Sequence, residues 1–141
     1  MDIYKFLNDH DIRFTRYDHA PVFTVEDVKH HVPPLPARRT KNLFLRDNKG
    51  KRHFLLIVND DKMVDLKALP STLGISKLSF GSPARLRNYL GVDPGSVSVL
   101  AIANDLNHKV DIIIDELWNK LESGQVRYGL NVDVGTLLAI E

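Results

Sequence analysis

Basic residues gather in one short stretch of the chain, from Arg38 to Arg52. This stretch holds seven Lys and Arg residues against the single acid Asp47, a net charge of +6, whereas the other 126 residues hold 12 basic and 17 acidic residues, a net charge of −5. A basic stretch on a mildly acidic body suits an anion bound at one place, such as a phosphate or a nucleic-acid end. A solvated hairpin rich in Lys and Arg has the same composition, so charge alone leaves both interpretations open.

Several familiar catalytic devices are absent from the sequence. Without cysteine, the chain has no disulfides, thiolate metal sites or cysteine nucleophiles, and it lacks the G-x-S-x-G, G-x-x-x-x-G-K-[ST], G-x-G-x-x-G and H-E-x-x-H motifs. No two of its six histidines are four residues apart, so we expect no helical metal site. The neighbouring acids Asp60 and Asp61, like Asp111 and Asp115, are interpreted as turn and strand-end residues. We therefore expect neither a metal nor another cofactor.

The elements around the basic stretch can be placed from patterning. The sequence predicts a helix over residues 2–8, a strand over 13–18 and a helix over 25–30, followed by a proline-rich loop over 32–36. Two apolar runs, 42–47 and 52–59, flank the turn Asn48-Lys49-Gly50-Lys51 and predict a β-hairpin. This hairpin would place Lys41 at the mouth of a strand.

The second half of the chain also alternates between expected helices and expected strands. A helix is expected over 66–73 with Asp65 as its cap, a strand over 77–80, and a helix through Leu90 that starts with Ser82 and Pro83 and ends at Gly91. Apolar strands are expected over 97–103 and 109–114, then a helix over 115–121 and closing strands over 125–127 and 134–140.

These elements predict one domain over residues 1–141, of the α/β or α+β class, with a mixed, largely antiparallel sheet surrounded by short helices. The 141 residues and 43% hydrophobic content suit one core. The chain has no apolar run of membrane-spanning length and no secretory leader pattern, so we expect a cytoplasmic protein without membrane contact.

Five short segments carry a resemblance to a known family. They are, in order, Asp-His-Ala-Pro-Val-Phe-Thr at 18–24, Lys-Asn-Leu-Phe-Leu-Arg-Asp at 41–47, Val-Asp-Leu-Lys-Ala-Leu at 64–69, Lys-Leu-Ser-Phe-Gly at 77–81 and Pro-Gly-Ser-Val-Ser at 94–98. Together they resemble the YbaK/ProX family, free-standing relatives of the editing domain inserted in bacterial prolyl-tRNA synthetases. The resemblance implies a YbaK-like fold and an aminoacyl-tRNA deacylase acting in trans.

In that chemistry water attacks the ester that joins a wrong amino acid to tRNA, most often alanine on proline tRNA, and no covalent enzyme intermediate forms. The resemblance implies catalytic roles for Lys41, which would anchor the terminal adenosine and its phosphate, and for Gly95, whose backbone would approach the substrate carbonyl. It also implies that Asn42, Ser96 and His19 bind substrate. We expect Arg38, Arg39 and Arg46 to bind the tRNA acceptor end, and prolyl-tRNA synthetase is a candidate partner.

Two segments depart from the family pattern. Val99 stands where the family loop ends in proline, and Tyr128 stands where the family has a histidine, while Asn131 matches the family asparagine only after a register shift. All three positions are expected to line the amino-acid pocket, so we expect altered substrate selectivity. The alternative hypothesis is a non-catalytic paralogue that binds a tRNA acceptor end or an aminoacyl ligand as an accessory to a synthetase.

Overall fold

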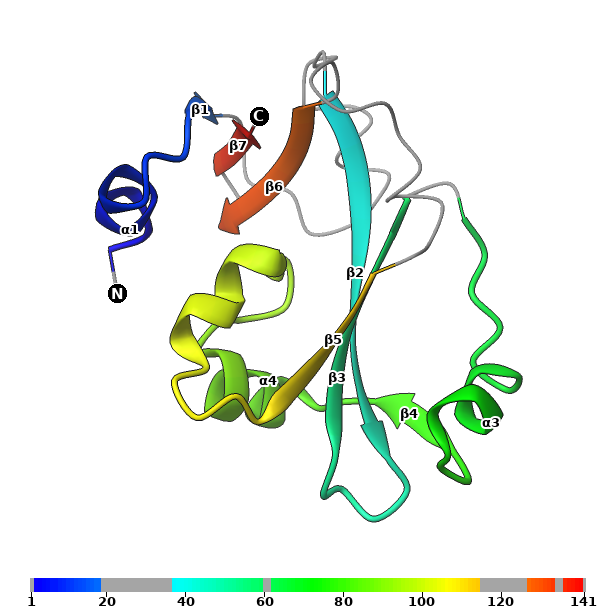
Figure 1. Ribbon diagram of the computed structural model, residues 1–141. Coiled ribbons are helices and arrows are strands. Elements are labelled where there is room, and N and C mark those ends of the chain that lie inside the picture. The colour runs from blue at the N-terminus through cyan, green and yellow to red at the C-terminus, as the bar shows by residue number, and fades with distance from the viewer. Residues whose placement is uncertain (1, 19–36, 60–61, 115–126, 134–135, 141) are drawn as a thin grey trace.

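The computed structural model describes residues 2–18, 37–59, 62–114, 127–133 and 136–140, which form one sheet with short helices beside it (Figure 1). The described elements are α1 (Ile3–Asp9), β1 (Phe14–Asp18), β2 (Ala37–Asp47), β3 (His53–Asn59), α3 (Leu69–Leu73), β4 (Leu78–Phe80), α4 (Pro83–Leu90), the 3₁₀ helix η1 (Val99–Asn104), β5 (Val110–Ile114), β6 (Arg127–Asp133) and β7 (Thr136–Ile140).

The sheet has the strand order β1-β7-β6-β2-β3-β5, and β4 pairs with β2 off this path. Four of the strand pairs are antiparallel, whereas β2 with β6 and β3 with β5 are parallel. A mixed, largely antiparallel sheet with short helices was the expected architecture, and the α+β class is confirmed.

Strand β2 is the longest strand and connects the two parts of the sheet (Figure 1). Its first three residues, from Ala37 to Arg39, run parallel to β6, and the next seven, from Thr40 to Arg46, run antiparallel to β3. Its last residues, Leu45 to Asp47, also pair with β4. The strand begins five residues before the predicted residue 42, because residues 37–39 are held by pairing with β6, and Thr40 and Lys41 by pairing with β3, and not by an apolar pattern.

The two faces of the β2–β3 hairpin bury separate apolar clusters, because side chains alternate along each strand. On one face, β2 and β3 pack against α4 and η1 through a cluster of Phe44, Leu55, Ile57, Leu86, Leu90, Ala101 and Val110. We call this the α4 face. On the other face, which we call the α3 face, the cluster is Leu45, Phe54, Leu56, Val58 and Leu78, with Leu69 and Leu73 of α3 packed on it.

Residues 97–103 do not form the predicted strand, since the structure has the 3₁₀ helix η1 there. Ser98 begins it with a side-chain oxygen that accepts a hydrogen bond from the Leu100 N–H at 3.2 Å. A continuous apolar run is compatible with either a strand or a buried helical segment, so patterning could not decide between them.

Other boundaries differ by smaller amounts. The predicted helix over 66–73 shortens to α3, because Asp65 caps a turn, accepting from the N–H groups of Lys67 and Ala68 at 3.0 and 3.3 Å. The closing strands are β6 and β7, and the part of β6 over 128–133 was not predicted as a strand. The predicted elements over 25–30, 32–36 and 115–121 lie outside the described residues.

Helix α4 agrees with its prediction at both ends. The Ser82 hydroxyl accepts from the Arg85 N–H at 3.1 Å, and Pro83 occupies the first helical position, where its missing N–H is not needed. Gly91 ends the helix with a φ of +67°, a conformation that costs glycine least.

Gly81 follows β4 where the chain passes the ring of Phe44, and its N–H donates to the Phe44 carbonyl at 2.9 Å. A Cβ at this position would lie 2.3 Å from Cδ2 of Phe44, which is too close. We expect Gly81→Ala to lower the free energy of unfolding by about 1–3 kcal/mol because the buried ring must move. Urea denaturation would measure the change. The exposed Ser76→Ala is the control, expected within about 0.5 kcal/mol of wild type, and equal stability of the two variants would contradict the packing argument.

Candidate functional site

Lys41, the first predicted catalytic residue, lies within β2 and not at its mouth, because β2 begins four residues earlier. It is half-buried, pairs with Val58 of β3, and its ammonium group donates a hydrogen bond to the main-chain carbonyl of Lys62. Since Val58 belongs to the cluster on the α3 face, Lys41 lies on that face too. A lysine within a central strand has a well-defined position, which a binding role needs.

Asn42 lies on the α4 face, next to a second asparagine. Its Nδ2 donates to Oγ1 of Thr40 at 3.5 Å, and Thr40 pairs with Asn59 at the end of β3. The side-chain oxygens of Asn42 and Asn59 are both buried, and no described residue donates a hydrogen bond to either. Buried acceptors without a donor are uncommon and unfavourable. Asn59 was not among the predicted site residues, since its only signal in the sequence is a polar residue at the end of an apolar strand.

The parallel pairing of β2 with β6 brings two groups of predicted residues together. Arg38 is in register with Tyr128, and Arg39 is in register with Gly129. Asn131 lies two residues further along β6 than Gly129, opposite Leu137 of β7. These are backbone positions, and they place the predicted tRNA-binding arginines beside the segment in which the chain departs from its family pattern.

The Gly95 loop packs on the α4 face. Gly95 has a φ of +91°, in the left-handed region that favours glycine, and the Ser96 N–H closes a turn onto the Asp93 carbonyl at 3.0 Å. Val97 and Val99 pack against the cluster that contains Ile57, the pairing partner of Asn42. The loop therefore shares a face of the sheet with Asn42.

The structure does not bring all the predicted residues together. Lys41 is on the α3 face and bound to Lys62, whereas the loop that holds Gly95, Ser96 and Val99 packs on the α4 face. The predicted convergence of Lys41 and Gly95 on one ester therefore remains a prediction. His19 lies outside the described residues.

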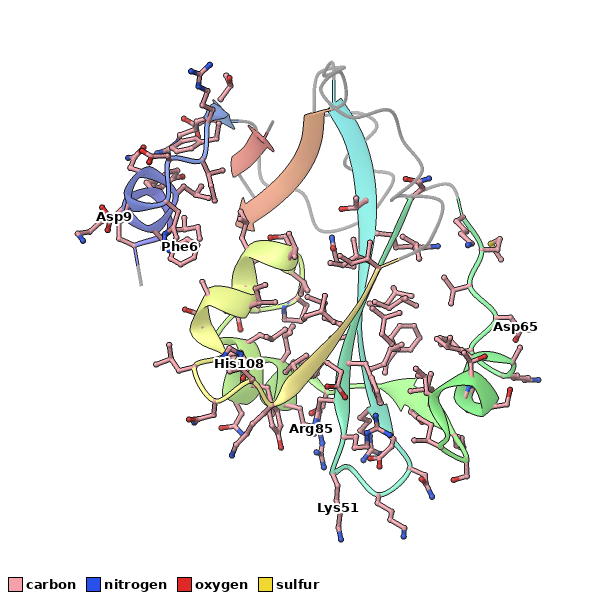
Figure 2. The ribbon with its side chains drawn as sticks, viewed as in Figure 1. Phe6, Asp9, Lys51, Asp65, Arg85 and His108 are labelled. Atoms are coloured by element: carbon pink, nitrogen blue, oxygen red, sulfur yellow. The ribbon has the colours of Figure 1, made fainter. Side chains whose placement is uncertain are left out.

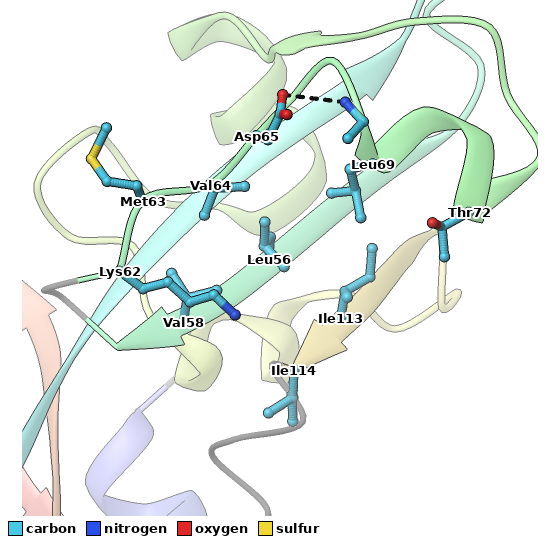
Figure 3. A pocket seen from close by; sticks show the side chains of 11 residues that line it. Leu56, Val58, Lys62, Met63, Val64, Asp65, Leu69, Thr72, Ile113 and Ile114 are labelled. Carbon is cyan, nitrogen blue, oxygen red and sulfur yellow. Dashed lines mark hydrogen bonds between the residues drawn. The ribbon is translucent and has the colours of Figure 1, made fainter.

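A pocket of about 400 Å³ opens on the α3 face, and its lining includes Val58, the pairing partner of Lys41 (Figure 3). Leu56 and Val58 of β3, Ile113 of β5 and Leu69 of α3 give it a largely apolar lining. Lys62, whose carbonyl accepts the Lys41 hydrogen bond, and Asp65 also line it. Its volume is within the range of small-molecule sites, and a largely apolar lining with a few charged side chains suits a ligand with both apolar and polar parts.

Neither a metal cluster nor a membrane-spanning helix occurs in the described part of the chain. Within the described ranges, no three His, Asp or Glu side chains group as metal ligands. None of the described helices has the length and apolar character needed to cross a membrane.

A sequence model of the aminoacyl-tRNA editing domain matches residues 19–124. The chain belongs to this family. The match covers the basic stretch, the Gly95 loop and most of the sheet, and it confirms the YbaK/ProX resemblance and, with it, the enzyme class, an aminoacyl-tRNA deacylase.

Individual relatives of this editing domain agree with the assignment. The prolyl-tRNA editing protein ProX of Acetoanaerobium sticklandii is 37% identical over 110 residues, covering 78% of this chain and 67% of the relative. Proteins named prolyl-tRNA synthetase associated domain-containing protein 1 are 36% identical in Danio rerio, over 81% of this chain and 61% of theirs, and 34% identical in Xenopus laevis, over 90% and 75%. The chain thus spans between three fifths and three quarters of these relatives.

Solved structures support the fold of the editing domain. A crystal structure of a hypothetical protein superimposes with a TM-score of 0.73 at 14% identity, covering 99% of this chain and 87% of the other. A structure described as that of a candidate trans-editing enzyme for prolyl-tRNA synthetase superimposes with a TM-score of 0.64 at 16% identity, covering 97% and 80%.

The first residue of β3 in this editing domain, opposite Arg46 at the far end of β2, is a buried histidine. His53 is fully buried, between the rings of Phe44 and Tyr89 at centroid distances of 5.6 and 3.9 Å, and its Nε2 lies 3.2 Å from Nη1 of Arg85. Since an arginine can only donate, Nε2 of His53 accepts and the imidazole is neutral. Burial, then the positive charge of Arg85, hold the pKa of His53 below its usual range.

Asp47 precedes the hairpin turn and is also buried. Burial alone would raise the pKa of its carboxyl group, but hydrogen bonds from the backbone of Arg52, Lys51 and Gly50 outweigh burial and lower that pKa. The Asp47 carboxylate accepts hydrogen bonds from the backbone N–H groups of Lys51 and Arg52, at 2.9 and 3.2 Å. The carboxylate thus stabilises the hairpin turn.

The neutral state of His53 predicts how stability depends on pH. In the unfolded chain the imidazole takes up a proton near pH 6.5, whereas in the folded protein burial, and then Arg85 and Arg46, oppose that proton more strongly than Asp47 favours it. The free energy of unfolding should therefore fall as the pH decreases below about 6.5. Chemical denaturation between pH 5 and 8 would measure it.

Two variants isolate the cause. His53→Gln keeps an oxygen that can accept from Arg85 but cannot titrate, so its stability should vary less over this interval. The exposed His10→Gln leaves the buried cluster intact and should retain the full decrease. The same pH dependence in all three proteins would show that other groups cause it.

Proposed function

We propose that the chain hydrolyses mischarged aminoacyl-tRNA in trans, with alanine on proline tRNA or another small amino acid ester as substrate. Family membership over residues 19–124 is the observation that carries this proposal. Relatives named for prolyl-tRNA editing and for association with prolyl-tRNA synthetase support the choice of tRNA. We propose the same synthetase as a partner and the cytoplasm as the place of action.

The reaction needs little from the protein beyond positioning. An aminoacyl ester is already activated, so water attacks the carbonyl carbon, a tetrahedral oxyanion forms, and the ribose oxygen leaves with a proton. Gly95 would present its backbone N–H to the oxyanion, because its positive φ gives a turn that another residue adopts only with strain. No side-chain nucleophile takes part in this scheme.

Lys41 would bind the phosphate of the terminal adenosine. Its ammonium group would exchange the Lys62 carbonyl for the phosphate oxygen. The apolar pocket on the α3 face has the volume to receive an adenosine against Val58 and Ile113. The Lys41 ammonium, which is bound to a residue of the pocket lining, and the apolar side chains of that lining match the two parts of a nucleotide.

Asn42 and Asn59 would offer acceptors on the α4 face, which is the face of the Gly95 loop and opposite to that of Lys41. Their buried oxygens have no donor among the described residues, so an N–H or O–H group of the substrate would satisfy acceptors that are otherwise unpaired. Asn42 is held by Thr40, which fixes the direction of its amide oxygen.

One observation favours a second candidate, the non-catalytic binding protein. In the described structure the Lys41 ammonium is bound to Lys62 on the α3 face, whereas the Gly95 loop is on the α4 face. A protein that only binds the acceptor end needs Lys41 and the arginines and has no need of the Gly95 loop. Turnover of a mischarged tRNA distinguishes the two.

The decisive test is deacylation of a panel of mischarged tRNAs by wild type and by Lys41→Ala. We expect turnover by wild type and a loss of about a hundredfold in the variant, the effect of removing about 3 kcal/mol of charge stabilisation. Asn42→Ala, which removes a positioning contact, should reduce the rate less.

Lys5→Ala is the matched control, because this lysine is exposed and lies on α1, outside the proposed site. Thermal melting should show that all three variants remain folded. Wild-type turnover by Lys41→Ala would remove Lys41 from the mechanism, and tight tRNA binding without any turnover by wild type would favour the binding protein.

The departures from the family pattern predict altered selectivity. Val99 is the first residue of η1, a position that tolerates proline, so Val99→Pro can be introduced without disturbing the helix. We expect wild type to accept several small amino acids. Val99→Pro with Tyr128→His should narrow or shift that range, because each altered contact changes the difference in transition-state binding between two amino acids by about 1–3 kcal/mol. Deacylation of alanyl-, seryl- and threonyl-tRNA measures the profile, and identical profiles would show that the two positions do not set selectivity.

A further inference from the structure

Two guanidinium groups meet above Gly50 in the turn between β2 and β3. A Cβ on Gly50 would lie 2.8 Å from Nη2 of Arg85 and 3.1 Å from Nη1 of Arg46. Gly50 itself has a φ of +68° and no side chain, so both guanidinium groups occupy the space that a larger residue would need. Arg46 is on β2 and Arg85 is on α4, and the fold therefore brings together charges that are 39 residues apart.

No acidic side chain in the described ranges balances these charges. The Asp47 carboxylate accepts from the backbone of the turn, and the nearby ion pairs, Arg52 with Asp111 at 3.4 Å and Arg87 with Asp93 at 2.6 Å, use other arginines. Lys49 and Lys51 are exposed at the tip of the hairpin, where Figure 2 shows Lys51 directed away from the body. Like charges held this close repel each other, so an anion between them would be stabilised.

Hydrogen bonds hold the Arg85 guanidinium in place. Its Nη1 donates to the Gly50 carbonyl at 3.1 Å and to Nε2 of His53 at 3.2 Å. Both contacts use the same nitrogen, so Nη2, which points at Gly50, remains available to a ligand. An arginine fixed in advance loses less entropy on binding a phosphate than a free one.

We propose that Arg46 and Arg85, with Lys49 and Lys51 around them, form a phosphate-binding site for the sugar–phosphate backbone of the acceptor stem. We call these four residues the hairpin-tip site. The proposal rests on the proposed function, and it assigns to the tip a contact with paired RNA that is separate from the reacting end at Lys41.

The separation of the two sites along β2 supports the stem as the ligand. The five residue steps from Lys41 to Arg46 span about 17 Å of strand, and in a duplex each strand places a phosphate about every 3.4 Å along the helix axis. A substrate whose reacting end is at Lys41 would therefore bring phosphates several nucleotides from that end, towards the stem, to the tip. Basic residues spread from Arg38 to Lys51 suit a polyanion, whereas a free phosphate would need one cluster only.

The test compares a long with a short substrate. The double variant Lys49→Gln/Lys51→Gln and the single variant Arg46→Gln would be assayed on full-length mischarged tRNA and on the same amino acid esterified to a cytidine-cytidine-adenosine trinucleotide. We expect the ratio of kcat/KM for the long substrate to that for the short one to fall about tenfold. The log–log salt slope of tRNA binding should become shallower by about 0.9 for each phosphate that the variant no longer neutralises.

Lys5→Gln/Lys67→Gln removes the same charge from α1 and from the segment before α3, and it should leave the ratio unchanged. An unchanged ratio and salt slope in the hairpin variants would overturn the proposal, and so would an equal loss on both substrates. If wild type hydrolyses neither substrate, the proposed function fails, and the salt slope of uncharged tRNA binding still decides whether the tip contacts the stem.

Discussion

The rest of the structure depends on the pairing of β2 with three partners at once. Its start is fixed by β6, its middle by β3 and its end by β4. Because strand side chains alternate, this register decides that Lys41 lies with Val58 on one face and that Asn42 lies with Ile57 on the other. A slip of one residue would exchange the faces of Lys41 and Asn42 and bury a charge among apolar side chains.

At the hairpin tip the fold holds two positive charges close together in fixed positions. Arg46 and Arg85 stand together, and His53 beneath them is kept neutral by burial and by Arg85. The Asp47 carboxylate, which could have neutralised them, is instead fixed by the backbone of the turn. Like charges held this close are unfavourable for the isolated protein, unlike a stabilising ion-pair network, and the anion proposed to bind between them would offset that repulsion.

Sequence signals that depend on neighbouring residues predicted the turns and helix starts well. They could not predict which distant segments of the chain pair with each other. The turn at Asn48 to Lys51 and the Ser82-Pro83 start of α4 each depend on neighbours in sequence, and both were predicted correctly. The parallel pairing of Arg38 with Tyr128 joins segments 90 residues apart, and the meeting of Arg85 with Gly50 depends on how α4 docks. The α4 face could not be assigned to Asn42 and Asn59 before the register of β2 and β3 was known. The apolar run at η1 carried no period that separates strand from helix.

The contact of Lys41 with Lys62 constrains the role that this lysine can take. A hydrogen bond from an ammonium group to a carbonyl contributes about 1.5–3 kcal/mol, so a ligand must offer more than another neutral acceptor to displace it. The carbonyl of an ester offers no more than the carbonyl of Lys62 does. A phosphate oxygen carries a full charge, and its attraction to the ammonium group near a protein surface is about 4 kcal/mol at a separation of 4 Å. The exchange therefore favours the anion, and Lys41 is better suited to anchoring the nucleotide than to polarising the ester.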